Sequence, residues 1–75
     1  MSDTFGKTID DLDRRFTYHP PKGDQNVRYM KVREKAKEFA ELICMHSEPS
    51  REQALAITKI EEAVMWCNAG IARNE

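Results

Sequence analysis

The sequence has 75 residues, a formal net charge of −1, 33% charged residues and two cysteines, Cys44 and Cys67. One domain of this length buries only about 60% of its unfolded surface, and the cysteines form neither a disulfide framework nor the paired spacing of structural zinc. We therefore expect a single domain over 1–75 that is stabilised by oligomerisation and needs no metal or cofactor.

The N-terminal segment, residues 1–13, is polar and acidic, with four carboxylates against one lysine. It lacks the apolar core of a signal peptide, and no later run reaches the roughly 20 apolar residues of a membrane span. These features predict a cytosolic protein without a membrane partner, with residues 1–7 flexible.

A short helix is predicted for residues 8–16. Thr8 can cap its start, and Ile9, Leu12 and Phe16 recur at the three- and four-residue steps of one helical face. The pattern gives this segment an apolar face in only two turns.

Residues 17–24 form the predicted connector. Pro20 and Pro21 interrupt any helix, and a residue that precedes a proline favours extended geometry. A stiff, extended segment is expected, with Tyr18 and His19 just before the proline pair.

The aromatic rings of Phe16 and Tyr18, beside and on this connector, allow two interpretations. An aromatic ring close to basic residues can stack on a nucleobase while a neighbouring Lys or Arg meets its phosphate. Alternatively, the rings of Phe16 and Tyr18 pack the N-terminal segment onto the rest of the chain. The residues alone leave Tyr18 open between these readings and favour packing for Phe16.

A long helix is predicted for residues 25–46, with Asp24 as its N-cap. Its apolar positions follow the helical period and comprise Val32, Ala36, Phe39, Ala40 and Ile43. Residues 14–37 carry eight bases against two acids, which favours ligands that bear phosphate. Mixed charge along a helix is also typical of a solvated face.

A second long helix is predicted for residues 50–73. Pro49 cannot continue the preceding helix, and Ser50 with Gln53 has the pattern of a capping box. The apolar stripe that should pack on the first long helix comprises Ile57, Ile60, Val64, Cys67 and Ile71. Two such helices joined by a short turn form an antiparallel hairpin, so the predicted fold class is all-α.

A lone hairpin encloses no core, so its remaining apolar residues need another partner. Cys67 is expected to be a small packed residue on the stripe, and Cys44 a similar one. Met65 and Trp66 lie off the stripe, and burying them requires a second surface, most simply another copy of the chain.

No catalytic residue is predicted. The chain has two histidines, and neither belongs to a nucleophile, base and acid arrangement or to a repeated metal-binding motif. We therefore expect a binding protein and not an enzyme.

Three stretches together resemble the phage anti-CBASS cyclic-oligonucleotide sponge family, over about residues 14–74. They are FTYHPPKGDQ at 16–25, PSREQ at 49–53 and IEEAVMWCNAGIAR at 60–73, with an Arg-Tyr pair in the first turn of the long helix. The resemblance implies a small helical homohexamer in the cytoplasm of the infected bacterium. It also implies that the protein sequesters cyclic oligonucleotide messengers without cleaving them.

The resemblance further implies two kinds of site. Cyclic dinucleotides such as cyclic GMP-AMP would lie between protomers, with Tyr18 stacking on a base and Arg33, or the neighbouring Lys31, near the phosphates. Cyclic trinucleotides would lie around a threefold axis, where His19, Lys35 and Arg73 are the candidate contacts.

The alternative function is a helical oligomerisation or DNA-binding adaptor that uses the basic helix on phosphate backbones. It predicts affinity for duplex DNA that falls steeply with salt. The acidic remainder of the chain argues against a protein that coats DNA generally.

Overall fold

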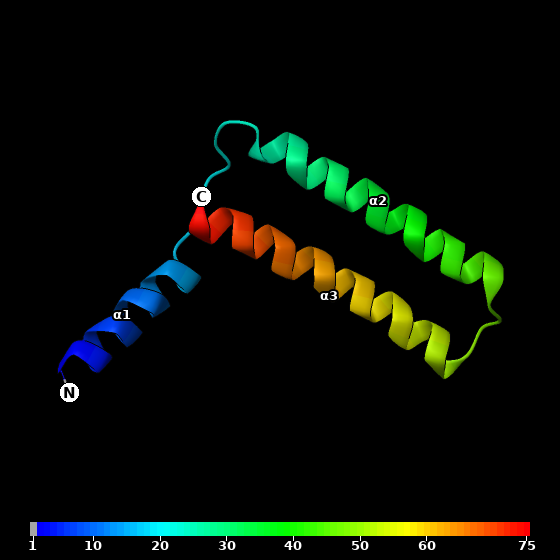
Figure 1. Ribbon diagram of the computed structural model, residues 1–75, viewed down its shortest axis with the longest axis horizontal. Coiled ribbons are helices and arrows are strands. Elements are labelled where there is room, and N and C mark those ends of the chain that lie inside the picture. Colours follow the sequence, from blue (N-terminus) through cyan, green and yellow to red (C-terminus); the bar gives the residue numbers. More distant parts are fainter. Residues whose placement is uncertain (1) are drawn as a thin grey trace.

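The computed structural model describes the backbone of residues 2–75 and the side chains of residues 8–75. It contains α1 (Ser2–Phe16), α2 (Gln25–His46) and α3 (Arg51–Asn74). The helices α2 and α3 form an antiparallel pair, whereas α1 extends away from the end at which the chain enters α2 and leaves α3 (Figure 1). The predicted all-α fold with a helical hairpin is confirmed. Over residues 2–75, no helix combines the length and apolar character that a membrane crossing requires.

The first helix begins at Ser2, six residues before the predicted start at Thr8. Gly6 lowers helix propensity by about 1 kcal/mol relative to alanine, but it does not block the helical backbone. Thr8 therefore lies inside the helix and is not its N-cap. The predicted flexible segment includes Met1, which lies outside the described residues.

The connector is fixed at its junction with α2. Gly23 adopts a φ of 59°, a left-handed conformation that side chains disfavour. The backbone N–H of Gln25 donates to the carbonyl of Lys22 at 3.1 Å, and the Gln25 side-chain oxygen accepts from the Lys22 N–H at 3.1 Å. Among residues 8–75, Gln25 is the one buried residue. Asp24 occupies the N-cap position without a side-chain capping bond.

The turn between α2 and α3 is closed by polar side chains. Ser50 caps α3, since its hydroxyl accepts from the Gln53 N–H at 3.0 Å. The Gln53 amide does not complete the reciprocal capping box but reaches back to Ser47, donating to its carbonyl at 3.1 Å and its hydroxyl at 3.0 Å. The turn therefore joins the end of α2 directly to the start of α3.

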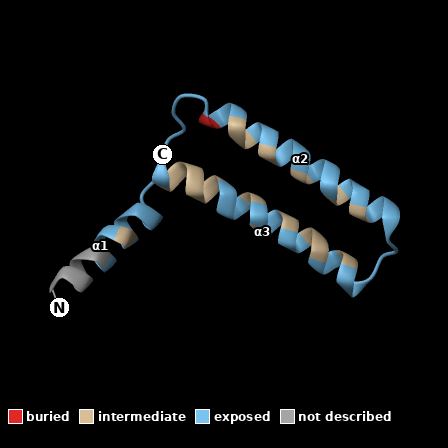
Figure 2. Ribbon diagram, viewed as in Figure 1, coloured by how far each residue is buried: buried red, intermediate tan, exposed pale blue. Residues whose placement is uncertain are grey.

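The chain is a thin layer of helices. Its extents are 53 × 31 × 13 Å, and its radius of gyration is 16.8 Å, against about 11 Å for a compact domain of this length. No apolar side chain among residues 8–75 is buried, as the colouring of Figure 2 makes clear. The chain thus has a packed seam but no enclosed core.

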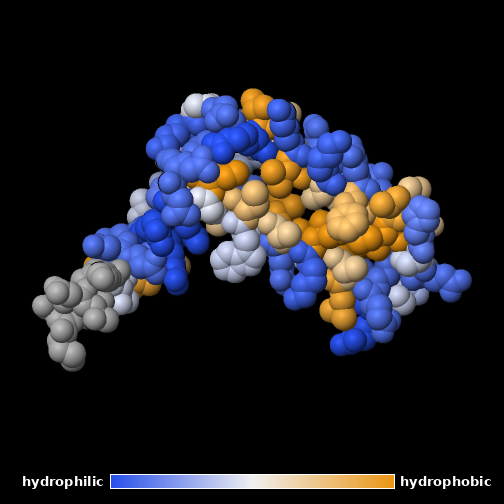
Figure 3. All heavy atoms as spheres, in the orientation of Figure 1, coloured by the Kyte–Doolittle hydropathy of each residue, from blue (hydrophilic) through white to orange (hydrophobic). Residues whose placement is uncertain are grey.

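The seam between α2 and α3 consists of half-buried residues, including Val32, Ala36, Ile57, Ile60 and Val64. They follow the predicted stripes, and hydrophobic side chains gather between the two helices over the middle of the hairpin (Figure 3).

Two apolar predictions were wrong for the single chain, since Cys44 and Cys67 are exposed. Phe39, one of the apolar positions of α2, is 54% exposed. Two helices packed side by side cover only a narrow stripe of each other's surface. A side chain next to that stripe therefore remains exposed to solvent.

Grooves flank the seam. The larger one, the Phe39 groove, has a volume of about 660 Å³ and is almost entirely apolar. It is lined by Val32, Lys35, Ala36, Phe39, Ile43, Ala56, Lys59, Ile60, Ala63, Val64 and Cys67. Met65 and Trp66, at 67% and 69% exposed, also lie outside the seam.

Candidate functional site

A hollow of about 390 Å³ lies where the connector meets the open end of the hairpin. We call it the Tyr18 hollow. Its lining residues come from α1, the connector, α2 and α3, and are Arg15, Thr17, Tyr18, His19, Tyr29, Arg33, Asn68, Ala69, Ala72 and Arg73. The fold thus brings together residues that lie more than 50 positions apart.

Tyr18 contributes an open aromatic face to this hollow. Its side chain is 78% exposed, and the connector that carries it is anchored by Gln25 at the start of α2. Because the proline pair also stiffens the connector, the ring is held beside the hairpin without packing into it. Exposure of this kind favours the binding interpretation of Tyr18 over the packing one.

His19 is half-buried and fastens the connector to the end of α1. Its Nε2 lies 2.7 Å from the carbonyl oxygen of Arg14. A carbonyl only accepts, so Nε2 carries the hydrogen and Nδ1 remains a possible acceptor. His19 therefore has a structural role that the sequence did not reveal.

The hollow contains two guanidinium groups, of Arg33 and Arg73, that have no carboxylate partner among residues 8–75. Arg33 makes no ion pair with any described residue, and Arg73 donates only to the backbone carbonyl of Arg15, at 3.5 Å. Arg15 itself is paired with Asp11, at 2.9 Å. Arg33 and Arg73 are thus the guanidinium groups best able to receive an anion.

Arg28, in the first turn of α2, is already occupied. It donates to Glu75 at 2.7 Å and forms an ion pair with Asp24 at 3.2 Å. The hydrogen bond to Glu75 raises the pKa of Arg28 above its ordinary value, outweighing the opposite effect of desolvation. This side chain ties α2 to the C-terminus and is not free for a ligand.

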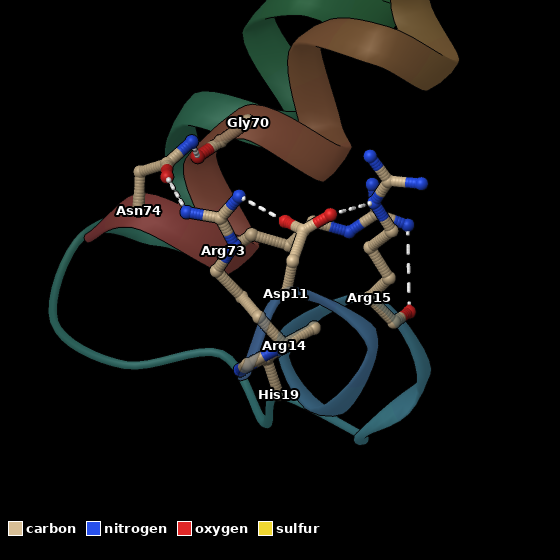
Figure 4. Close-up of polar contacts among 7 residues, drawn as sticks. All are labelled: Asp11, Arg14, Arg15, His19, Gly70, Arg73 and Asn74. Carbon is tan, nitrogen blue, oxygen red and sulfur yellow. Dashed lines mark hydrogen bonds and ion pairs between the residues drawn. The ribbon is translucent and has the colours of Figure 1, made fainter. Parts of the chain in front are cut away.

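Polar contacts hold α1 against the end of α3 (Figure 4). Arg14 donates to Asp11 at 2.7 Å and to Asn74 at 3.3 Å, and Asn74 in turn donates to the Gly70 carbonyl at 3.0 Å.

Beside these contacts lies a second hollow, of about 500 Å³, which is lined by Phe16 and Trp66 among others. Phe16 is 83% exposed, so the expectation that it packs the N-terminal segment onto the hairpin was wrong. The α1 segment is held by polar groups instead.

The predicted site residues separate into two groups in the structure. Tyr18, Arg33, His19 and Arg73 line the Tyr18 hollow, although they had been assigned to two different kinds of site. Lys31 and Lys35 are not among its lining residues; Lys35 pairs with Glu38 at 3.1 Å and borders the Phe39 groove.

Tyr29 and Asn68 are among the lining residues of the hollow that sequence reasoning did not assign to a site. The oxygen Oδ1 of Asn68 is buried and has no hydrogen-bond partner among the described residues, a state that costs roughly 1–3 kcal/mol. Helical spacing does place Tyr29 one turn before Arg33, which is the signal that would have found it. No local pattern marks Asn68, because its neighbours in the hollow come from other elements.

This arrangement suits reversible binding. An open ring can stack on a base, and guanidinium groups without carboxylate partners can form paired hydrogen bonds with phosphate. Among the described residues, no group of three His, Cys, Asp or Glu side chains could hold a metal ion.

Comparison with protein families also indicates a binding protein. Residues 8–72 match the family model described as Acb2/Tad1, hairpin domain. The chain belongs to this family. Acb2/Tad1 hairpin proteins are anti-CBASS sponges, which bind cyclic oligonucleotides and are not enzymes. Searches against individual curated proteins and against solved structures gave no match.

The range that matches the family contains most of the residues that line the Tyr18 hollow. The matched range includes the whole connector, all of α2, most of α3 and every lining residue of the Tyr18 hollow except Arg73. The Acb2/Tad1 hairpin therefore carries its exposed ring and unpaired arginine within the part of the chain that defines the family.

Proposed function

We propose that this protein binds cyclic dinucleotides such as cyclic GMP-AMP, and also cyclic trinucleotides, and sequesters them without cleavage. A phage would express it in the cytoplasm of the infected bacterium, where it would lower the free messenger and block CBASS signalling. The observation that carries the proposal is the exposed ring of Tyr18 in one hollow with Arg33 and Arg73, two guanidinium groups without carboxylate partners among residues 8–75.

Each residue has a defined role in this proposal. Tyr18 stacks on a nucleobase, and Arg33 donates paired hydrogen bonds to phosphate, with Lys31 adding charge nearby. For cyclic trinucleotides, Arg73 and His19 contact the ligand, and Lys35 approaches it from another copy of the chain.

The ligand also explains why the protein would assemble. A cyclic dinucleotide has two bases and two phosphates, which suits a site formed by equivalent residues of two protomers. We propose a homohexamer, in which every Tyr18 hollow is completed by a neighbouring copy.

Calorimetric titration with cyclic GMP-AMP tests the proposal. Stacking contributes about 1–3 kcal/mol per base, so Tyr18→Ala should raise Kd roughly 5- to 150-fold. Tyr18→Phe, the matched control, keeps the ring and should bind nearly as well as the parent. Absence of binding to any cyclic di- or trinucleotide would refute the proposal.

Sequestration without cleavage has its own test. Heating the complex releases the ligand, which chromatography should recover intact and in full. Recovery of linear products in an amount that grows with incubation time would show instead that the protein is an enzyme.

The basic half of α2 supports a second candidate, the DNA-binding adaptor. Lys31, Arg33 and Lys37 are exposed and lack ion pairs with described residues. This function predicts binding to duplex DNA with a steep salt dependence and no effect of Tyr18→Ala. Titration of the same variants with duplex DNA separates the two candidates.

A further inference from the structure

The apolar face of α1 is exposed in the part of the helix whose side chains are described, residues 8–16. Ile9 and Leu12 are 42% and 41% exposed and Phe16 is 83% exposed, and α1 points away from the hairpin (Figure 1). An amphipathic helix of 15 residues is marginal in water unless its apolar face is packed against another surface. The α1 helix therefore requires a surface that its own hairpin does not provide.

The Phe39 groove is a surface of the matching kind. Its apolar lining follows α2 from Val32 to Ile43, a length of about 17 Å, and α1 is about 22 Å long. A helix laid along two helices buries its stripe between them, as in other helix-in-groove contacts. The groove and the helix thus agree in length and in apolar character.

Charge distinguishes the Phe39 groove from other apolar surfaces of the chain. Its charged lining residues are Lys35 and Lys59, and no carboxylate lines it. Both lysines pair with glutamates on their own helices, and such surface ion pairs are worth little and exchange readily. Residues 1–13 are acidic, and Asp13 borders the apolar face of α1 without an ion pair to any described residue.

We propose that α1 of one copy docks in the Phe39 groove of a second copy. The polar contacts of Arg14 and His19 fasten the last turn of α1 to the end of its own hairpin, and the rest of the helix extends away from it (Figure 1), so the groove it fills belongs to a neighbour. Ile9 and Leu12 lie on the apolar floor, and Asp13 meets Lys35 or Lys59. The docking does not depend on a nucleotide, and it carries the connector with Tyr18 toward the neighbouring copy.

Disulfide trapping in the absence of nucleotide tests this contact. One full-length chain carries Leu12→Cys with Cys44→Ser and Cys67→Ser; the other carries only Cys44→Ser and keeps Cys67, which lines the groove. Any disulfide between positions 12 and 67 in the mixture then joins two chains. The control moves the new cysteine to Asp10→Cys, about 160° round the helix from Leu12.

The expected result is at least about tenfold more 12–67 than 10–67 disulfide by peptide mass spectrometry, since the bond requires Cα atoms within about 7 Å. Equal yields from the two positions overturn the proposal.

A second variant tests the same contact without cross-linking. Leu12→Glu should weaken self-association in sedimentation velocity roughly 10- to 100-fold, the effect of exposing a buried leucine. Circular dichroism verifies that the helices persist. Unchanged self-association of a folded Leu12→Glu chain overturns the proposal, whatever the outcome of nucleotide binding.

Discussion

At the scale of single residues, the site depends on the kind of charge as much as on its sign. Arg33 lines the hollow with Tyr18 and has no carboxylate partner in the described part of the chain, whereas Arg15 and Arg28 are paired. A guanidinium presents a planar fork that can bind phosphate through two hydrogen bonds, whereas an ammonium acts as a point charge. Pairing within the chain therefore selects which arginines are free for a ligand.

Arg33 gives the first prediction at this scale. Arg33→Ala should weaken binding of cyclic GMP-AMP roughly 10- to 150-fold, the usual effect of losing hydrogen bonds to a charged group. Arg33→Lys keeps the charge and should fall between the parent and Arg33→Ala in a calorimetric titration. Lys37→Ala is the matched control, because Lys37 lies on the same helix outside the Tyr18 hollow. Equal losses for Lys37→Ala and Arg33→Ala would show a general charge effect.

Replacing two glycines by alanine should change the free energy of unfolding in opposite directions. Gly23 has a φ of 59°, so Gly23→Ala should lower the free energy of unfolding by about 1–2 kcal/mol. Gly70 lies inside α3, and an added methyl group would meet nothing within 4 Å, so Gly70→Ala should raise it by about 1 kcal/mol. Urea unfolding at one fixed protein concentration measures both. A loss in both variants would contradict the helical environment of Gly70.

At the scale of elements, local signals account for most of the helix boundaries. Pro49 and Ser50 predicted the break between α2 and α3, and the Ser50 cap was confirmed by its bond to Gln53. The start of α1 was not predictable in this way, because Ser2 to Lys7 contain no strong signal that places a boundary at either end. Strong helix-breaking residues are read reliably from sequence, whereas the extent of a helix without them is not.

The capping hydroxyl of α3 is testable by substitution. Ser50→Ala removes the acceptor for the Gln53 N–H and should lower the free energy of unfolding by about 1 kcal/mol. Thr58→Ala is the control, since Thr58 is exposed inside the same helix and alanine has the higher helix propensity. Thermal unfolding of the two variants should therefore shift in opposite directions, and a parallel shift would assign the effect to something other than the cap.

At the scale of the whole molecule, the surface area argues for assembly. The chain exposes 6288 Å², against about 4,700 Å² for a compact monomer of 8.7 kDa. The excess is about twice the roughly 800 Å² that one partner contributes to a standard interface. A hairpin with apolar grooves beside its seam therefore has enough uncovered surface for more than one neighbour.

Self-association gives the prediction at this scale. Sedimentation equilibrium should yield a particle close to six times the chain mass of 8.7 kDa. Trp66, the single tryptophan, is 69% exposed in one chain, so its fluorescence should shift to the red on dilution as copies separate. The melting temperature should rise with protein concentration. A monomer at every concentration would contradict the proposed assembly and the docking of α1.

The sequence by itself determined that this protein is a helical hairpin with a stiff aromatic connector and a basic helix. These features depend on proline, glycine, capping residues and apolar spacing, all of which act within a few positions along the chain. Only the tertiary structure decided that Tyr18, Arg33 and Arg73 share one hollow, that Gln25 anchors the connector and that Cys67 is open in a groove. Which side chains meet and which remain exposed depends on how helices far apart in sequence cover one another, and a single layer of helices covers little.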